Sequence, residues 1–371
     1  MQNRIPFHRP ALSDKEWRYV EEALEGRWWA GGPFVERLEK ALEEIWGRPV
    51  VAVSSGTAAL EVALRLLLGE RGGEVIVPVW TFTASAAAVW HAGGIPVLVD
   101  VGPTLHIEAS HIEAALTPRT RGVIVVHYAG MAADMEAIQA VCARHGLWLV
   151  EDACHAQPGY YKGQLCGTFG EMATLSFHAT KPIAAGQGGA ILFRDSSFAE
   201  KARSWRRHGI KQDGANYWEY EVHFLGHNYQ MPELCAALAL AQVEKMQVRW
   251  KRRQAIAAQY TTLLKGVEAL ALYQADMAAC SWHLYPVFLE GGKDRRDKVL
   301  QRMGEKGFPI NLHYRPLHRH RAYQALVGEK RFPVADAAYE RVMTLPIWPE
   351  MTSEQVNQVC LALLETLAEV P

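Results

Sequence analysis

The stretch VIVPVWTFTASAAAVWHAGGIPVLVD, residues 75–100, decides the fold of this chain. Between 75 and 99 it contains no Asp, Glu, Lys or Arg, so its composition alone is similar to that of a membrane span. Pro78, Pro96 and the Gly93-Gly94 pair interrupt it where a spanning helix tolerates them poorly. We therefore predict a strand over 75–79, a helix over 83–92 and a strand over 96–100, which together form a βαβ unit.

The same alternation of short apolar runs and alanine-rich helical stretches extends on both sides of this unit. The further predicted strands cover residues 50–53, 122–126, 147–151, 173–177 and 190–193. Continuous apolar strands separated by helices are typical of a largely parallel sheet that is covered on both faces. The sequence therefore predicts an α/β protein with a mostly parallel seven-stranded sheet.

The alternation ends near Phe193, and the rest of the 371 residues has a different character. A basic and aromatic stretch, residues 203–224, has little periodicity and is predicted to be a long excursion or lid. Residues 232–264 then predict one long helix or a broken pair of helices. We place a boundary there, between a large domain over residues 1–247 and a smaller α+β domain over residues 248–371.

Near the N-terminus, residues 13–26 predict a helix. Ser13 is the expected N-cap, with Glu16 three residues later in the pattern of a capping box. Trp17, Val20 and Leu24 then recur at helical spacing.

Composition excludes several classes of protein. Lys and Arg number 39 against 40 Asp and Glu, a net charge of -1, whereas a general nucleic-acid binder needs a basic excess. The six cysteines form no C-x-x-C pair, and their wide spacing fits neither a zinc site nor a disulfide framework. We expect free thiols, no metal, and, because no signal-peptide pattern opens the sequence, a cytoplasmic location.

Several predicted strands are followed at once by side chains that could bind a ligand, and the carboxyl ends of strands are where α/β sheets do so. Gly56 and Thr57 begin a helix directly after the strand 50–53, which could form a phosphate cup or simply an ordinary helix start. Phe82 follows the strand 75–79 and could stack on a flat ring or fill the core.

Two charged residues occupy equivalent positions further along the chain. Asp152 follows the strand 147–151, where it could neutralise a protonated ring nitrogen, cap a helix or form a structural ion pair. Lys181 lies in a glycine-rich loop after the strand 173–177, either as a desolvated nucleophile or as a surface lysine. A phosphate cup, an aromatic ring, an Asp and a Lys at the ends of one sheet are what pyridoxal phosphate (PLP) requires. Their joint occurrence predicts a PLP site.

Motifs spread over nearly the whole chain carry a family resemblance: AVSSGTAAL, EDACHA, LSFHATK, GHNYQMPELCAALALAQ and NLHYRPLH. With them the chain resembles the DegT/StrS family of PLP-dependent sugar aminotransferases, whose architecture is fold type I (aspartate aminotransferase-like). Within that family it is most similar to enzymes that aminate the 4-keto group of UDP-linked sugars, such as the one making UDP-4-amino-4-deoxy-L-arabinose.

The resemblance implies roles for individual residues. Lys181 would form the aldimine with the cofactor and act as acid and base, and Asp152 would face the pyridinium nitrogen. His155 would lie on the hydroxyl side of the ring. The other implied cofactor contacts are Gly56, Thr57 and Ser176 at the phosphate, Phe82 on the ring face, and Asn228 reaching the phosphate of the partner subunit in a homodimer.

The implied reaction moves an amino group from L-glutamate or L-glutamine to the keto group, expected at C4, of a nucleotide-linked sugar. Gln230 stands where the family commonly has an Arg near the donor carboxylate, so the donor stays open. His313 belongs to a basic cluster over 311–321 that, like residues 203–207, could meet a nucleotide diphosphate or lie on a surface. A PLP-dependent dehydratase or lyase and a non-catalytic PLP-binding sensor are the alternatives, and Lys181 together with Asp152 favours amination.

Overall fold

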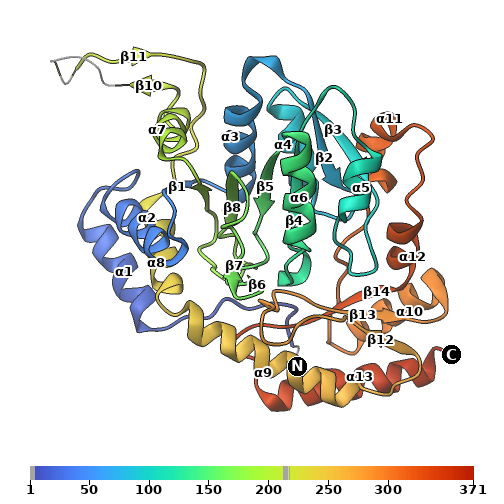
Figure 1. Ribbon diagram of the computed structural model, residues 1–371. Coiled ribbons are helices and arrows are strands. Elements are labelled where there is room, and N and C mark those ends of the chain that lie inside the picture. Colours follow the sequence, from blue (N-terminus) through green and yellow to red (C-terminus); the bar gives the residue numbers. More distant parts are fainter. Residues whose placement is uncertain (1–4, 212–215, 217) are drawn as a thin grey trace.

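A seven-stranded sheet forms the centre of the computed structural model, which describes residues 5–211, 216 and 218–371 (Figure 1). Its strands are β1 Val50–Val53, β2 Glu74–Pro78, β3 Ile95–Val99, β4 Thr120–Val126, β5 Trp148–Asp152, β8 Met172–Ser176 and β9 Gly189–Phe193. Their order is β1-β9-β8-β5-β4-β2-β3. Only β9 runs antiparallel to its neighbours β1 and β8, and the other pairs are parallel. The predicted α/β class and the seven predicted strands are confirmed.

The apparent membrane span is the βαβ unit β2–α4–β3, with α4 over Thr83–His91. Within the described residues, every helix is too short or too polar to cross a bilayer. Both faces of the sheet are buried, which explains why its strands are apolar without alternation. In β1, for example, Val51 packs in the core with α3 (Gly56–Leu68), whereas Val50 packs in the core on the other face with α2 (Pro33–Trp46).

The helices around this sheet also follow the predicted alternation. They are α5 Ala109–Ala114, α6 Met135–His145, α7 Ser196–Trp205 and α8 Glu233–Val243. The predicted long helix over 232–264 is a broken pair, because α8 ends at Val243 and α9 covers Met246–Leu264. Two short hairpins complete this part, β6 Tyr160–Tyr161 with β7 Gln164–Leu165 and β10 Ile210–Lys211 with β11 Glu221–Val222.

The last third of the chain forms a smaller antiparallel sheet of β12 Leu270–Leu272, β13 Tyr285–Leu289 and β14 Val342–Leu345. Helices α9, α10 (Gly292–Glu305) and α13 (Ser353–Glu369) surround an apolar core there, and Ile5 joins this core from the N-terminus. The short helices α11 Gln324–Val327 and α12 Pro333–Arg341 connect the elements. The division into 1–247 and 248–371 stays a prediction, and α9 runs through it as one helix.

Helix α1, Asp14–Glu25, has the predicted capping box at Ser13, but the apolar residues that recur at helical spacing do not form its buried face. Tyr19 and Ala23 are buried, whereas Trp17 is 69% exposed and Leu24 is 46% exposed. Polar contacts orient the helix: Glu16 Oε1 accepts hydrogen bonds from Gln242 Nε2 at 3.0 Å and from Arg249 Nη2 at 2.7 Å. Anchoring this buried carboxylate to α8 and α9 outweighs burial of the more apolar stripe.

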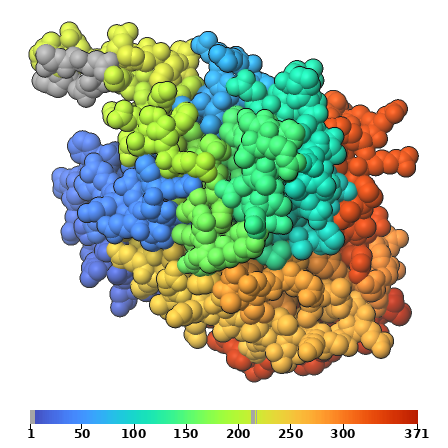
Figure 2. Space-filling view, in the orientation of Figure 1, coloured from blue at the N-terminus to red at the C-terminus, as the bar shows by residue number. Residues whose placement is uncertain are grey.

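The basic stretch over 203–224 contains the end of α7 and the β10–β11 hairpin, which projects from the rest of the molecule (Figures 1 and 2). Residues 212–215 and 217 of the predicted excursion lie outside the described residues. The sequence left open whether residues 203–207 bind a nucleotide diphosphate or lie on a surface. For Arg203 and Arg206 the structure favours a structural role, because both side chains bind β1. Arg203 Nη2 donates to the carbonyl of Val50 at 3.2 Å, and Arg206 Nη1 donates to that of Ala52 at 2.6 Å. Arg206 also pairs with Glu39 at 2.5 Å.

Candidate active site

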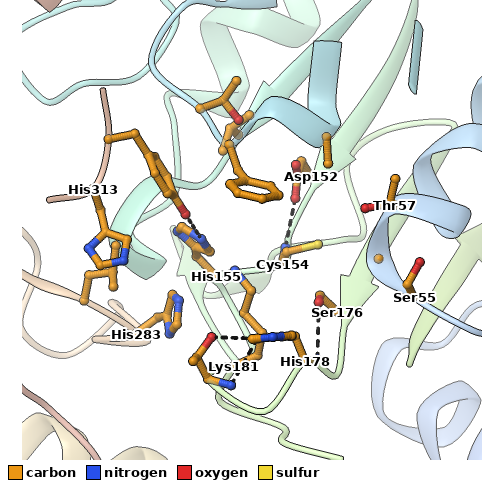
Figure 3. A pocket seen from close by; sticks show the side chains of 18 of the residues that line it. Ser55, Thr57, Asp152, Cys154, His155, Ser176, His178, Lys181, His283 and His313 are labelled. Atoms are coloured by element: carbon orange, nitrogen blue, oxygen red, sulfur yellow. Dashed lines mark hydrogen bonds between the residues drawn. The ribbon is translucent and has the colours of Figure 1, made fainter. Parts of the chain in front are cut away.

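A cavity of about 330 Å³ lies at the carboxyl ends of the parallel strands. It is lined by all the predicted site residues except Asn228 and Gln230, namely Gly56, Thr57, Phe82, Asp152, His155, Ser176, Lys181 and His313. These residues come from the ends of separate strands and from the C-terminal part of the chain, and Figure 3 shows many of them around one space. The fold therefore brings together residues that are up to about 260 positions apart in the sequence.

One end of the cavity is the N-terminus of α3. The Ser55 hydroxyl accepts a hydrogen bond from the N–H of Ala58 at 3.0 Å and so caps the helix. Gly56 lies tightly against the end of β8, since a Cβ there would be 2.8 Å from the Cβ of Ser176. Thr57 and Ser176 add hydroxyls to the same end of the cavity (Figure 3). A helix N-terminus surrounded by hydroxyls attracts a phosphate group through the helix dipole and free N–H donors.

The adjacent carboxylates Glu151 and Asp152 have different surroundings. Glu151 is fully buried and accepts hydrogen bonds from the N–H groups of Phe169 at 2.7 Å and Gly170 at 2.8 Å, with His127 Nε2 at 3.0 Å. Asp152 lines the cavity, is only 7% exposed and forms no ion pair with any described residue. A buried carboxylate without a cation is costly, so Asp152 is suited to pair with a cationic group inside the cavity.

Asp152 is held by hydrogen bonds that sequence reasoning missed. The Ser85 hydroxyl donates to Asp152 Oδ2 at 2.8 Å, and the N–H of Cys154 approaches Oδ1 at 3.3 Å. Because the single Ser85 proton is used there, Thr81 is the donor in the 2.8 Å hydrogen bond between the Thr81 and Ser85 hydroxyls. The only signal in the sequence was the spacing of four residues between Thr81 and Ser85 at the start of α4.

Lys181 belongs to the loop between β8 and β9. Its N–H donates to the carbonyl of His178 at 2.8 Å, and the N–H of Ala185 donates to that of Phe177 at 2.8 Å, so the loop folds tightly back on itself. Burial lowers the pKa of the Lys181 ammonium below its usual value, although Cys154 and Asp152 act in the opposite direction. A partly desolvated amine of this kind is a stronger candidate for a nucleophile and base than an exposed lysine.

The other end of the cavity is lined by the imidazoles of His155, His283 and His313 and by the phenol of Tyr314. Tyr314 Oη and His155 Nε2 share a hydrogen bond of 2.9 Å, and the His155 ring lies 4.4 Å from that of His283. Burial lowers the pKa values of His155 and His283 well below the usual range, and lowers that of His313 to about 3. These imidazoles are therefore neutral. Tyr314 lies in the NLHYRPLH motif and His283 lies near β13, but neither follows a strand of the parallel sheet, so neither was named as a site residue.

Two predicted residues lie elsewhere in the described structure. Asn228 is exposed and forms an isolated bridge with Arg207 at the base of the β10–β11 hairpin. Gln230 is partly buried, with its side-chain oxygen close to Gly31. Phe82 does line the cavity, yet it is 56% exposed, with its ring 6.1 Å from that of Tyr314.

The residues of this cavity fit PLP. The α3 N-terminus suits its phosphate, the unpaired Asp152 suits a protonated ring nitrogen, and Lys181 suits its aldehyde. The described residues contain no group of three or more His, Cys, Asp or Glu side chains placed to hold a metal ion. The six described cysteines are free.

Comparisons with known proteins agree with this fit. Residues 10–364 match the DegT/DnrJ/EryC1/StrS aminotransferase family. The spore coat polysaccharide biosynthesis protein SpsC of Bacillus subtilis (strain 168) is 35% identical over 373 residues, covering 97% of this chain and 96% of its own length.

Solved structures have the same fold. PseC of Helicobacter pylori, an aminotransferase involved in the biosynthesis of pseudoaminic acid, has a TM-score of 0.94 at 26% identity, covering 99% of this chain and 100% of its own. Spr1654 from Streptococcus pneumoniae in its PLP form has a TM-score of 0.94 at 28% identity, with the same coverage, and a PMP form is also known. These neighbours are fold type I enzymes. The chain belongs to the DegT/DnrJ/EryC1/StrS aminotransferase family and is a PLP-dependent sugar aminotransferase.

Proposed function

We propose that this enzyme transfers an amino group from L-glutamate or L-glutamine to the C4 keto group of a nucleotide-linked sugar. The observation that carries the proposal is that Asp152, Lys181 and the N-terminus of α3 face one cavity. SpsC is a spore coat polysaccharide biosynthesis protein and PseC takes part in the biosynthesis of pseudoaminic acid, which supports an amino sugar as product. The nucleotide and the C4 position rest on the resemblance to enzymes of UDP-linked 4-keto-sugars.

In this proposal the chain's residues bind PLP by its two ends. Gly56, Thr57 and Ser176 hold the phosphate, Asp152 holds the proton on the ring nitrogen, and Phe82 covers a face of the ring. When bound, PLP serves as an electron sink for the carbon that loses its proton. Ser85 keeps Asp152 oriented toward the ring nitrogen by its hydrogen bond of 2.8 Å.

Lys181 moves the proton. Because burial lowers its pKa, a larger share of its Nζ is neutral and can take the proton from Cα of the amino donor. Nζ would pass that proton to the bound cofactor, and in the second half of the reaction it would take a proton back from the cofactor and deliver it to C4 of the sugar. His155, held by Tyr314 at 2.9 Å, lies beside this path as a neutral imidazole that can share a hydrogen bond with the ring hydroxyl.

The proposal includes a homodimer with shared sites. Asn228 lies outside the cavity of its own chain and is exposed, so it is free to serve the cavity of a partner. Gln230 would then approach the donor carboxylate from the same segment. We also propose a cytoplasmic location, which the free cysteines support because a reducing compartment keeps thiols unpaired.

The direct test is a panel of keto-sugar nucleotides with L-glutamate and L-glutamine as donors, with products identified by mass spectrometry. Gain of an amino group at C4 is the expected result. Loss of water or ammonia without amine transfer would identify a dehydratase or lyase instead, and bound cofactor without any turnover would identify a sensor.

Lys181→Ala is the matching test of the site. We expect a protein that remains folded but has lost the yellow colour of lysine-bound cofactor and at least about a thousandfold of its turnover. Wild-type protein reduced with borohydride should carry the cofactor on the peptide that contains Lys181. Full activity of the variant would contradict the assignment.

A further inference from the structure

The N-terminal segment over residues 5–11 contributes Phe7 and His8 to a wall of the cavity. Ile5 is only 3% exposed and packs in the C-terminal core. The carbonyl of Ala11 accepts hydrogen bonds from Gln242 Nε2 at 2.8 Å and Arg249 Nη2 at 3.3 Å. Between these anchors, His8 Nε2 donates to the carbonyl of Ala179 at 3.0 Å, two residues before Lys181. The segment is therefore held at three points, and its side chains have fixed places.

Phe7 lines the cavity from this segment and stacks on His313. The two rings are 5.6 Å apart and inclined by 20°. His313 is itself held, because its Nδ1 shares a hydrogen bond of 3.1 Å with the hydroxyl of Thr344. Its Nε2 is then the ring nitrogen left to bind a substrate.

Phe7 and His313 lie at the end of the cavity away from the phosphate cup. Figure 3 shows His313 on one side and Ser55 and Thr57 on the opposite side, with Asp152 and Lys181 between them. If the cofactor occupies the cup and the centre, the end at His313 receives the amino donor and the sugar in turn.

The chemistry of this end suits a sugar ring better than an amino acid. Among the described residues that line the cavity, Lys181 is the only Lys or Arg, so the wall at Phe7 and His313 offers no fixed positive charge to a carboxylate. A pyranose presents a face of C–H bonds that packs favourably on the negative face of an aromatic ring. Glutamate and glutamine have no such face.

We propose that Phe7, held against His313, is the wall on which the pyranose ring of the acceptor packs, and that Phe7 determines specificity for the sugar without serving the amino donor. This inference rests on the proposed function. The His313 Nε2 accepts or donates a hydrogen bond to a hydroxyl of the same sugar ring.

The test separates the two halves of the reaction in Phe7→Ala, Phe7→Leu and Phe7→Tyr. The donor half is measured with L-glutamate alone, from the change in absorbance of the bound cofactor. The acceptor half is measured as kcat and KM for a UDP-linked 4-keto-pentose and a dTDP-linked 4-keto-6-deoxyhexose. We expect Phe7→Ala to raise the sugar KM about tenfold and to leave the donor half within about twofold of wild type.

Phe7→Leu keeps a branched apolar side chain but not the aromatic face and should behave like Phe7→Ala, whereas Phe7→Tyr should restore the wild-type KM. Leu361→Ala, which removes a 60% exposed side chain from α13, is the matched control and should change neither half. Equal losses in both halves, or an unchanged sugar KM in Phe7→Ala, would overturn the inference. If wild-type protein aminates no sugar at all, the proposed function fails instead, so the two failures are distinguishable.

Discussion

Asp152 is held in place by a chain of two hydroxyl groups, those of Ser85 and Thr81. Thr81 donates to Ser85, and Ser85 donates to Asp152, each at 2.8 Å. Both hydroxyls are predicted to act through Asp152, as positioning residues. Removing either hydroxyl should weaken the interaction of Asp152 with the ring nitrogen. The effect should be larger for Ser85, which contacts Asp152, than for Thr81, which contacts only Ser85.

We predict that Ser85→Ala lowers kcat about tenfold, because a hydrogen bond to a charged group contributes roughly 1.5–3 kcal/mol. Thr81→Val should have a smaller effect, since Ser85 keeps its own bond to Asp152. Steady-state kinetics and the absorption spectrum of the bound cofactor measure both variants. An effect of Thr81→Val larger than that of Ser85→Ala would contradict this order of donors.

At the scale of elements, the phosphate cup depends on how closely α3 approaches β8. A Cβ on Gly56 would come within 2.8 Å of Ser176 Cβ, so any larger residue pushes the helix start away from the strand end. We predict that Gly56→Ala weakens PLP binding about tenfold or more, because overpacking typically costs 1–3 kcal/mol. Titration of the cofactor-free protein with PLP gives the dissociation constant.

Gly304→Ala is the control for that substitution. Gly304 lies on α10 with no neighbouring atom within 4 Å of an added Cβ, so its replacement should leave PLP affinity unchanged. It should also stabilise α10 slightly, by up to about 1 kcal/mol, because Ala favours helix more than Gly does. Equal PLP affinities for Gly56→Ala and Gly304→Ala would show that the close approach is not needed.

A second element-scale feature connects β4, β5 and the loop before β8. Glu151 on β5 meets His127, which follows β4, at 3.0 Å, and both side chains are fully buried. Burial alone would lower the pKa of His127, but Cys166 and Glu151 raise it to about 10. A raised pKa means that the charged His127 stabilises the fold fully below its ordinary pKa near 6.5, and that this contribution is lost as the pH rises toward about 10.

His127→Gln should therefore lower the free energy of unfolding by about 3 kcal/mol at neutral pH, the usual cost of breaking a buried pair. The difference from wild type should shrink as the pH approaches about 10. Urea unfolding at the two pH values measures it. Arg144→Gln, which removes an exposed pair with Glu113, is the control and should cost less than about 1 kcal/mol at either pH. A deficit in His127→Gln that does not change with pH would contradict the charged state of His127.

For the whole molecule, the distribution of site residues favours completion by a second copy. Phe82 is 56% exposed although it is expected to cover the cofactor, and Asn228 lies outside its own cavity. Most soluble oligomers are symmetric, so one such contact would be repeated and would complete two sites.

Mixed dimers test this arrangement. If Asn228 acts across the interface, a dimer of one Lys181→Ala chain and one Asn228→Ala chain has two different sites. The cavity of the Lys181→Ala chain lacks both Lys181 and Asn228, and the cavity of the Asn228→Ala chain has both. Equal amounts of the two chains should then recover about a quarter of the wild-type active sites, although each variant alone is impaired. Activity no higher than that of Asn228→Ala alone would place Asn228 in its own site.

The sequence by itself determined the sheet, the order of its strands in the chain and the residues at the strand ends. It could do so because buried parallel strands must be apolar throughout, and because polar residues directly after such strands meet at one edge. On that basis Asp152 and Lys181 were expected at one edge of the sheet, and both line the cavity there, whereas their roles toward the cofactor stay predictions.

Only the tertiary structure decided the matters that depend on contacts between distant segments. On α1, Tyr19 is buried and Trp17 is exposed, because Glu16 is oriented by hydrogen bonds from Gln242 and Arg249. The tertiary structure also brought Phe7 onto His313, some three hundred residues away, and so formed the wall opposite the phosphate cup. Such contacts follow from how complete elements pack, and local periodicity carries no information about them.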